Sequence, residues 1–228
     1  MTTAIVTGAS SGIGKSIATR LAEENINVVL VARNKEKLQQ IAEELTTTTE
    51  ATILPIPTDI SNQTEVTAMV EQAKERFGAI DVYVNNAGVM LNGAITDGAV
   101  EDWEKMIDVN IKGVLYGLHQ VIPDMIQRGT GHIVNIASVS GFEVSKKSTA
   151  YSATKFAVRA ISMGLEKELA RTGVRITNIS PGMVDTPLNT RGNVDRKPLD
   201  ASNIADSVVY AVLQPAHVNI NEMIIRPV

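Results

Sequence analysis

Short runs of β-branched and aliphatic residues alternate along the chain with longer stretches in which apolar positions recur every three or four residues. A short apolar run is typical of a buried strand, and the longer spacing is typical of an amphipathic helix. The pattern predicts strands at 3–8, 27–33, 51–57, 81–88, 131–138, 174–182 and 221–228. It predicts helices at 14–25, 35–46, 65–78, 101–126, around Tyr151, and at 204–214.

Strands that alternate with helices indicate βαβ units, which place parallel strands in one sheet with helices on both faces. Several of the strands are apolar almost throughout, as expected for a sheet that is covered on both sides. No linker rich in Pro, Gly or Ser interrupts the pattern, so we expect residues 1–228 to form a single α/β domain. Ligands of such sheets bind beyond the carboxyl ends of the strands, and the polar residues that follow each strand are therefore the functional candidates.

The amino-acid composition excludes several kinds of chemistry and several kinds of partner. The chain has no cysteine, which excludes disulfides, thiolate catalysis and Cys-based metal sites. Its histidines are scattered without metal-ligand spacing, so no metal site is expected; they are His119, His132 and His217. A net charge of −4 gives no general attraction to nucleic acid or to an anionic membrane. No signal-peptide pattern and no apolar run of ~18 residues is present, and we expect a cytoplasmic protein.

A glycine-rich turn, TGASSGIGKS at 7–16, follows the first expected strand and leads directly into a helix. Its glycines, Gly8, Gly12 and Gly14, would let backbone amides approach a diphosphate, and the helix N-terminus would face the diphosphate charge. The turn therefore predicts a dinucleotide site.

Two other interpretations of this turn remain open. Residues 8–12 fit the G-x-S-x-G elbow of serine hydrolases, which needs a histidine later in the chain, and only His217 is loosely placed for that role. The phosphate-binding pattern G-x4-G-K-[ST] would need glycine where Ala9 stands.

Tyr151 and Lys155 lie four positions apart in a helical stretch with small residues between them. That spacing puts both side chains on one helical face, about 5–6 Å apart at Cβ. A nearby cation lowers the pKa of a phenol below its usual value of about 10, which would make Tyr151 a proton donor and acceptor near neutral pH. About 0.2 such pairs are expected by chance, so the pair alone also fits a surface tyrosine packed on a lysine stem.

Five features occur together in one order: the glycine-rich turn, NNAG at 85–88, Asn110, Ser138 with twelve residues between it and YSATK at 151–155, and PG at 181–182. This combination resembles the short-chain dehydrogenase/reductase superfamily over nearly the whole chain. The resemblance implies a Rossmann-type, doubly wound α/β fold with seven parallel strands. It also implies hydride transfer between a nicotinamide cofactor and a small-molecule carbonyl or alcohol, and assembly as a homotetramer or dimer.

The resemblance assigns roles to four catalytic candidates. Tyr151 is the acid/base, Lys155 lowers its pKa and binds the nicotinamide ribose, Ser138 binds the substrate oxygen, and Asn110 holds a relay water. Asp59 would meet the adenine edge, and the 181–186 stretch would hold the carboxamide. The cofactor-binding set implied in this way is Gly8, Ser10, Ser11, Gly12, Ile13, Gly14, Arg33, Asp59, Ile60, Asn86, Ala87, Gly88, Tyr151, Lys155, Pro181, Gly182, Val184 and Thr186.

Arg33 follows the second expected strand, where an NAD site commonly carries a carboxylate for the ribose hydroxyls. A guanidinium there can bind a 2′-phosphate bidentately, and Ser10 could add a hydroxyl. The sequence therefore favours NADP(H) over NAD(H), with a solvated loop charge as the alternative for Arg33.

Substrate choice is expected in the loop after Ser138 and in the segment after Gly182, which is shorter than in most members of the family. The chain end, 214–228, resembles the branch of NADP-dependent dehydrogenases that act on serine and other 3-hydroxy acids. A carboxylate could be bound by basic residues that flank the expected pocket, namely Lys146, Lys147, Arg191 and Arg196. Solvated charges and general carbonyl reduction are the alternatives, and a non-catalytic nucleotide-binding sensor is a third.

Overall fold

The computed structural model describes residues 1–187 and 197–228. Its centre is a seven-stranded sheet in the order β3-β2-β1-β4-β5-β6-β7, and every neighbouring pair is parallel. The strands are β1 (Thr3–Thr7), β2 (Asn27–Ala32), β3 (Ile53–Pro57), β4 (Val82–Asn85), β5 (Gly131–Ile136), β6 (Val174–Pro181) and β7 (Glu222–Ile225). All seven expected strands and the doubly wound Rossmann-type fold are confirmed.

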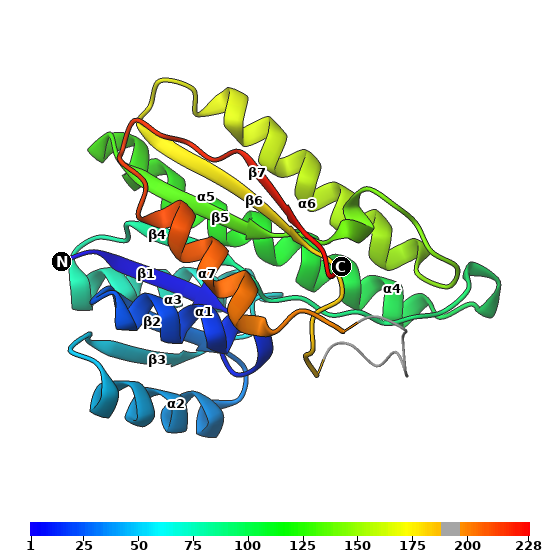
Figure 1. Cartoon of the computed structure of the whole chain (residues 1–228), viewed down its shortest axis with the longest axis horizontal. Helices are drawn as coiled ribbons and strands as arrows, with labels where there is room; N and C mark the ends of the chain where they lie inside the picture. Colours follow the sequence, from blue (N-terminus) through cyan, green and yellow to red (C-terminus); the bar gives the residue numbers. More distant parts are fainter. Residues whose placement is uncertain (188–196) are drawn as a thin grey trace.

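Helices cover both faces of this sheet (Figure 1). One face carries α1 (Gly12–Glu23), α2 (Lys35–Thr48) and α7 (Ala201–Val212). The other carries α3 (Gln63–Phe77), α5 (Gly113–Arg128) and α6 (Thr149–Glu168), and α4 (Val100–Ile107) leads towards α5. Each face has its own apolar core, with Ile17 and Leu38 fully buried in one and Val66 fully buried in the other. Two cores explain why the strands are apolar on both sides.

Local chemistry sets where the helices begin and end. The Asn34 side chain accepts a hydrogen bond from the Lys37 amide at 2.8 Å and caps α2. Asn62 caps α3 in the same way, through the Thr64 amide at 3.0 Å. A side-chain acceptor satisfies amides that the first turn of a helix leaves unpaired. The chain after β2 and β3 is thereby fixed at the edge of the sheet where ligands bind.

The helical pattern at 101–126 contains an irregularity that the periodicity does not reveal. Between α4 and α5, residues Asp108–Lys112 form a π-helical segment. A π-helical turn is wider than an α-turn and is frequently found at functional sites. Asn110 lies inside it and is only 1 % exposed.

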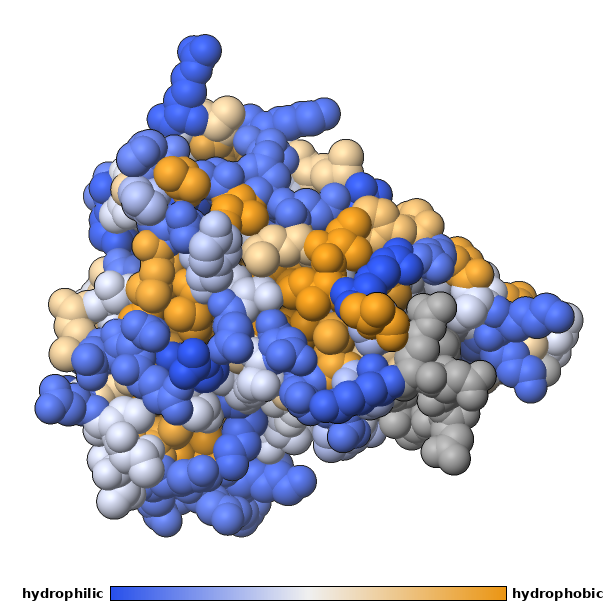
Figure 2. Space-filling view, in the orientation of Figure 1, coloured by the Kyte–Doolittle hydropathy of each residue, from blue (hydrophilic) through white to orange (hydrophobic). Residues whose placement is uncertain are grey.

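The chain leaves β1 towards β2 and β3 and returns to pair β4 with the opposite side of β1. This reversal of direction is the topological switch point, and a crevice forms at the carboxyl ends of the two strands. Figure 2 shows apolar side chains gathered on the visible face near those strand ends, beside more polar surface. Within the residues described, no helix has both the length and the apolarity to cross a membrane.

Candidate active site

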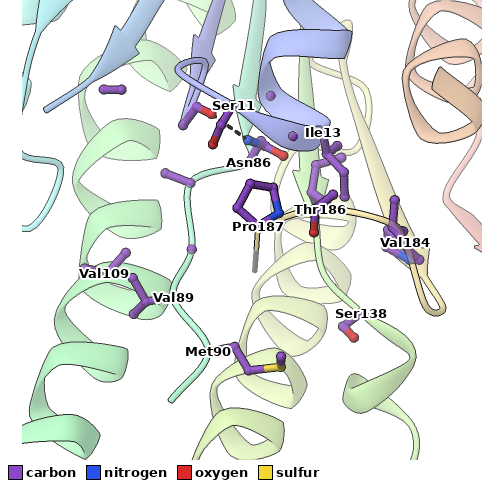
Figure 3. Close-up of a pocket in the computed structure, with 18 of the residues that line it drawn as sticks. Ser11, Ile13, Asn86, Val89, Met90, Val109, Ser138, Val184, Thr186 and Pro187 are labelled. Atoms are coloured by element: carbon purple, nitrogen blue, oxygen red, sulfur yellow. Dashed lines mark hydrogen bonds between the residues drawn. The ribbon is translucent and has the colours of Figure 1, made fainter. Parts of the chain in front are cut away.

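A cavity of about 530 Å³ opens at the carboxyl ends of the central strands, and its walls come from the segments that follow β1, β2, β3, β4, β5 and β6 (Figure 3). Every residue that the sequence places in catalysis or on the cofactor lines this cavity, except Asn110. The lining set is Gly8, Ser10, Ser11, Gly12, Ile13, Gly14, Arg33, Asp59, Ile60, Asn86, Ala87, Gly88, Ser138, Tyr151, Lys155, Pro181, Gly182, Val184 and Thr186.

The glycine-rich turn forms one end of the cavity. Gly8 and Gly12 have φ values of +69° and +53°, which favour glycine. At Gly14, a Cβ atom would overlap the Gly8 carbonyl and the Asn86 side-chain amide. The side chain of Ser11 stands at the N-cap of α1 and makes no capping hydrogen bond. The first amides of α1 are therefore available to an anion in the cavity, as a diphosphate site requires.

The two competing interpretations of this turn find no support in the geometry. Lys15 forms an exposed ion pair with Glu44 at 2.9 Å and does not line the cavity, so it lacks the position of a phosphate-binding lysine. None of the chain's three histidines, all of which are described, lines the cavity beside Ser10. A serine hydrolase needs a base at that point.

Thr7 ties the glycine-rich turn to the end of β4, a role that the sequence analysis missed. Its hydroxyl donates to the Val84 carbonyl at 3.1 Å and accepts from the amides of Asn86 and Ala87, both at 3.0 Å. The Asn86 side chain returns a hydrogen bond to the Thr7 carbonyl at 2.8 Å. Asn85 instead donates to Asn135 at 2.9 Å, so both asparagines of the NNAG stretch brace the sheet.

Arg33 and Asp59, which follow β2 and β3, also line the cavity. Burial raises the pKa of Asp59, but hydrogen bonds from the side chain and backbone of Ser61 outweigh it, and the charge of Arg33 acts in the same direction. The pKa of Asp59 therefore falls below its usual value. The Asp59 carboxylate and the exposed guanidinium of Arg33 thus present opposite charges at the rim.

Tyr151 and Lys155 face the cavity from α6, and they are only 6 % and 5 % exposed. The Lys155 ammonium lies 5.9 Å from the centre of the Tyr151 ring and donates to the Ile136 carbonyl at 2.9 Å. Burial lowers the pKa of Lys155 to about 8. A mostly charged ammonium is therefore held beside a phenol, and both side chains are almost fully buried.

Ser138 follows β5 and begins a short 3-10 turn, Val139–Gly141. Its oxygen accepts from the Ser140 amide at 3.1 Å, which orients the side chain at the cavity wall. That bond does not use the hydroxyl hydrogen of Ser138. The hydroxyl can therefore donate to an oxygen placed in the cavity.

Asn110 lies behind the cavity wall. Its side chain accepts from the Val89 amide at 2.8 Å and donates to the Val89 carbonyl at 2.9 Å and to Thr154 at 3.0 Å. The amide group thus holds the segment after β4. A Cβ atom on Gly88 would lie 3.3 Å from the Asn110 side-chain oxygen and 3.7 Å from the Lys155 ammonium. A relay water at Asn110 stays a prediction, because its amide is already bonded to protein groups.

Figure 3 places Ser11, Ile13 and Asn86 at one end of the cavity and Met90 and Ser138 at the other. The sequence analysis missed a further set of lining residues, each within two positions of a residue that it named. They are Ala32, Asn34, Thr58, Val89, Met90, Val109, Ile136, Ala137, Val139, Ser140, Met183 and Pro187. Most of them follow the end of a strand, and that position is the signal that could have identified them; Val109, which lies in the π-helical segment, has no such signal.

Of the basic residues proposed for a carboxylate, Lys146 and Lys147 are exposed and do not line the cavity. Arg191 and Arg196 lie outside the described residues. In the part of the chain that is described, no three His, Asp or Glu side chains cluster as metal ligands would.

A Rossmann-type sheet with a glycine-rich turn at its switch point defines a nucleotide-binding α/β protein. Residues 2–197 match the family model described as short chain dehydrogenase. The chain is 55% identical over 228 residues to an uncharacterized oxidoreductase of Staphylococcus saprophyticus, covering 99% of this chain and 97% of the relative. An uncharacterized oxidoreductase of Staphylococcus aureus is 54% identical over 226 residues, covering 99% and 96%. The chain belongs to the short-chain dehydrogenase family of oxidoreductases.

Solved structures agree with this assignment. An alcohol dehydrogenase of the archaeon Thermococcus sibiricus, complexed with 5-hydroxy-NADP, superposes with a TM-score of 0.92 at 30% identity, covering 98% of this chain and 95% of its own. The serine dehydrogenase of Escherichia coli superposes with a TM-score of 0.87 at 34% identity, covering 97% and 96%. A serine dehydrogenase complexed with NADP+ has a TM-score of 0.90 at 33% identity, covering 97% and 93%.

Proposed function

We propose that this protein is an NADP(H)-dependent oxidoreductase that interconverts a ketone or aldehyde and the corresponding alcohol, with Tyr151 as the acid/base. The observation that carries the proposal is the buried Tyr151–Lys155 pair, which faces the same cavity as Ser138 and the glycine-rich turn. Carbonyl reduction needs a proton for the oxygen and a partner for the charge that develops on it.

The cavity fits a nicotinamide dinucleotide by its chemistry. The amides of the first turn of α1 suit the diphosphate, Asp59 suits the adenine edge, and the 181–186 stretch suits the carboxamide. When bound, the nicotinamide supplies the hydride in carbonyl reduction and accepts it in alcohol oxidation.

The chain's own residues handle the oxygen and its proton. The Ser138 hydroxyl donates a hydrogen bond to the carbonyl oxygen, and Tyr151 donates the proton that converts it to an alcohol. The Lys155 ammonium, fixed by the Ile136 carbonyl, stabilises the negative charge that then remains on the phenolic oxygen. In alcohol oxidation the same atoms act in reverse, and Tyr151 takes the proton.

NADP(H) is favoured over NAD(H) by the charge at the end of β2. Arg33 is exposed at the cavity rim and can bind a 2′-phosphate, which only NADP(H) carries. Structural neighbours at 30% and 33% identity are described as complexes with 5-hydroxy-NADP and NADP+.

The wall beside Ser138 supports a neutral carbonyl substrate. Met90 and Val139 line the cavity at that end and present apolar surface, as small-molecule pockets commonly do. A 3-hydroxy acid of the serine type is the second candidate, supported by the two serine dehydrogenases among the neighbours. Parallel assays of neutral ketones and of serine and 3-hydroxypropionate separate the two.

Association into a homodimer or homotetramer is supported by apolar side chains that α4, α5 and α6 leave exposed. Ile107, Leu115, Phe156 and Met163 are 42 %, 45 %, 40 % and 51 % exposed. Burying such side chains between copies is favourable by about 25 cal/mol per Å². Light scattering on the purified protein gives the mass directly, and a monomer at micromolar concentration contradicts this part of the proposal.

The experiment that tests the function measures binding and turnover separately. NADPH and NADH are titrated by fluorescence, and a panel of ketones, aldehydes and semialdehydes is added while the absorbance of the reduced cofactor is followed. We expect tight NADPH binding and turnover, and a loss of about 10²–10⁴-fold in kcat for Tyr151→Phe with NADPH affinity retained. Binding without turnover by the wild-type chain would favour a sensor, and turnover that survives in Tyr151→Phe contradicts the assigned mechanism.

A further inference from the structure

Arg159 lies on α6 one helical turn beyond Lys155, outside the cavity lining, and it joins three separate elements. Its Nε atom donates to Glu222 of β7 at 2.9 Å, and its Nη2 atom donates to the second carboxylate oxygen at 3.4 Å. The centre of the guanidinium lies 3.9 Å from the centroid of the Phe142 ring. One planar side chain thus binds a carboxylate through its edge and an aromatic ring through its face.

The Glu222 carboxylate also accepts a hydrogen bond from the neighbouring strand β6. Glu222 pairs in register with Asn178 on β6, and the Asn178 amide donates to the same carboxylate at 3.1 Å. The register continues to Asn135 and then to Asn85, so four polar residues form one row across β7, β6, β5 and β4. The side chains of Arg159 and Glu222 are 30% and 33% exposed, and the additional hydrogen bond from Asn178 orients the Glu222 carboxylate, which an isolated surface ion pair lacks.

The same row is bonded to the catalytic helix. Asn135 donates to Ser162 of α6 at 2.9 Å, and Ser162 donates to the Val158 carbonyl at 2.9 Å. Lys155, Arg159 and Ser162 share one side of α6, because positions four and seven apart fall on a common face. The axial position of α6 against the sheet is therefore set by side chains on the face that carries the catalytic lysine.

Phe142 ends the short turn that begins at Ser138. The Gly141 amide donates to the Ser138 carbonyl at 2.8 Å, and the Phe142 amide donates to the Val139 carbonyl at 3.0 Å. This turn rests directly on α6, since a Cβ atom on Gly141 would lie 2.9 Å from the Lys155 carbonyl oxygen. The turn therefore begins at Ser138, on the cavity wall, and ends at Phe142, whose ring stacks on Arg159.

We propose that Arg159 is a positioning residue, which clamps the Ser138–Phe142 turn onto the catalytic helix and so aligns the Ser138 hydroxyl with the Tyr151 phenol. Ser138 follows a strand and Tyr151 lies on a helix, so their alignment depends on how the turn packs against α6. A misplacement of about 1 Å can cost about 10²-fold in rate. The proposal rests on the function proposed above, since it requires Ser138 and Tyr151 to act on one substrate oxygen.

The test is a double-mutant cycle that combines Arg159→Ala with Ser138→Ala. We expect Arg159→Ala to lower kcat/KM for the carbonyl substrate by about 10-fold in the wild-type background and by less than about 2-fold in the Ser138→Ala background. NADPH affinity should stay within about 2-fold throughout. A general structural defect would instead lower kcat/KM by the same factor in both backgrounds.

A second readout does not need turnover. In the cofactor-free protein, amide hydrogen exchange of Gly141 and Phe142 should accelerate by about 10-fold in Arg159→Ala, while peptides of α1 stay unchanged. Arg76→Ala is the matched control, because Arg76 lies 5.6 Å from the Phe77 ring on α3, away from the cavity. Phe142→Ala removes the other half of the contact and enters the same cycle should Arg159→Ala fail to fold.

The outcomes separate the two proposals. Wild-type turnover with an Arg159→Ala variant that keeps its kcat/KM, or that loses the same factor in both backgrounds, overturns the positioning role alone. Unchanged exchange at Gly141 and Phe142 overturns the clamp itself. A wild-type chain that binds NADPH and turns over no carbonyl overturns the proposed function and the positioning role with it.

Discussion

The two ends of the cavity differ in what carries their chemistry: the glycine-rich turn presents the first backbone amides of α1, and the other end presents side chains. Gly8 and Gly14 pack closely against each other and against Asn86, and a single added methyl group at Gly14 has no space. Around Ser138, Tyr151 and Lys155 the chemistry lies in three polar groups, each oriented by a neighbour. The first end should therefore fail when atoms are added, and the second when atoms or charges are removed.

The largest effect is expected from Gly14→Ala. The new Cβ would overlap the Gly8 carbonyl and the Asn86 amide, so the turn must move. We expect a loss of about 3 kcal/mol in the free energy of unfolding and no measurable NADPH binding. Urea unfolding and fluorescence titration check both.

Gly164→Ala is the matched control for that change. Gly164 lies within α6 with open space at its Cβ position, so alanine should stabilise the protein by about 0.5–1 kcal/mol. Equal stability losses for the two variants would mean that close packing does not distinguish the glycine turn from an ordinary helix.

The next effect concerns Lys155 and the dependence of stability on pH. Burial lowers the pKa of Lys155 from 10.5 to about 8, so the unfolded chain binds more protons than the folded chain between those two values. The cost of burying the ammonium is complete below pH 8 and disappears as the pH rises to 10.5, which amounts to about 3 kcal/mol. Urea unfolding of the cofactor-free protein should therefore show the wild type gaining that amount over Lys155→Met across this pH range.

Lys15→Met controls for the loss of one lysine, since the Lys15 side chain on α1 is 40% exposed. Its stability curve is expected to run parallel to that of the wild type across the same pH range. Parallel curves for Lys155→Met as well would show that the site does not desolvate its ammonium.

The smallest of the three effects is expected from a substitution of Arg33, at the rim of the cavity. Arg33→Asp should weaken NADPH binding by about 1.5–3 kcal/mol, because a charge-assisted hydrogen bond to the 2′-phosphate is lost and a repulsion is gained. NADH binding should change by only a few-fold. Titration of both cofactors measures the difference, with Arg76→Asp on α3 as the control for charge alone. Equal losses for the two cofactors would remove the assigned preference.

The backbone end of the cavity could be predicted from sequence because its signals are local. A strand, three glycines and a helix follow one another within residues 3–23, and their spacing predicts the turn, although not the bonds that join Thr7 to the end of β4. The seven strands were predictable for the same reason, since each is a short apolar run bounded by polar residues. Only the bounds differ, by a few residues at the strand ends.

The side-chain end depends on contacts that no local pattern encodes. Asn135 and Asn178 stand in otherwise apolar strands, and only the register of β5 with β6 shows that they lie side by side. The role of Arg159 becomes visible once β7 brings Glu222 beside α6. The π-helical turn around Asn110 has the composition of an ordinary helix, so the apolar periodicity predicts one continuous helix there.

The position of β1 between β2 and β4 also affects how the chain folds. The crevice cannot form until residues 82–84 have paired with residues 4–6 across some eighty intervening positions, a slow closure for a parallel sheet. A dinucleotide that binds only the closed form adds about 2.7 kcal/mol when present at a hundred times its Kd. Under the proposed function, saturation with dinucleotide would therefore lower the fraction of the chain that is open to proteolysis.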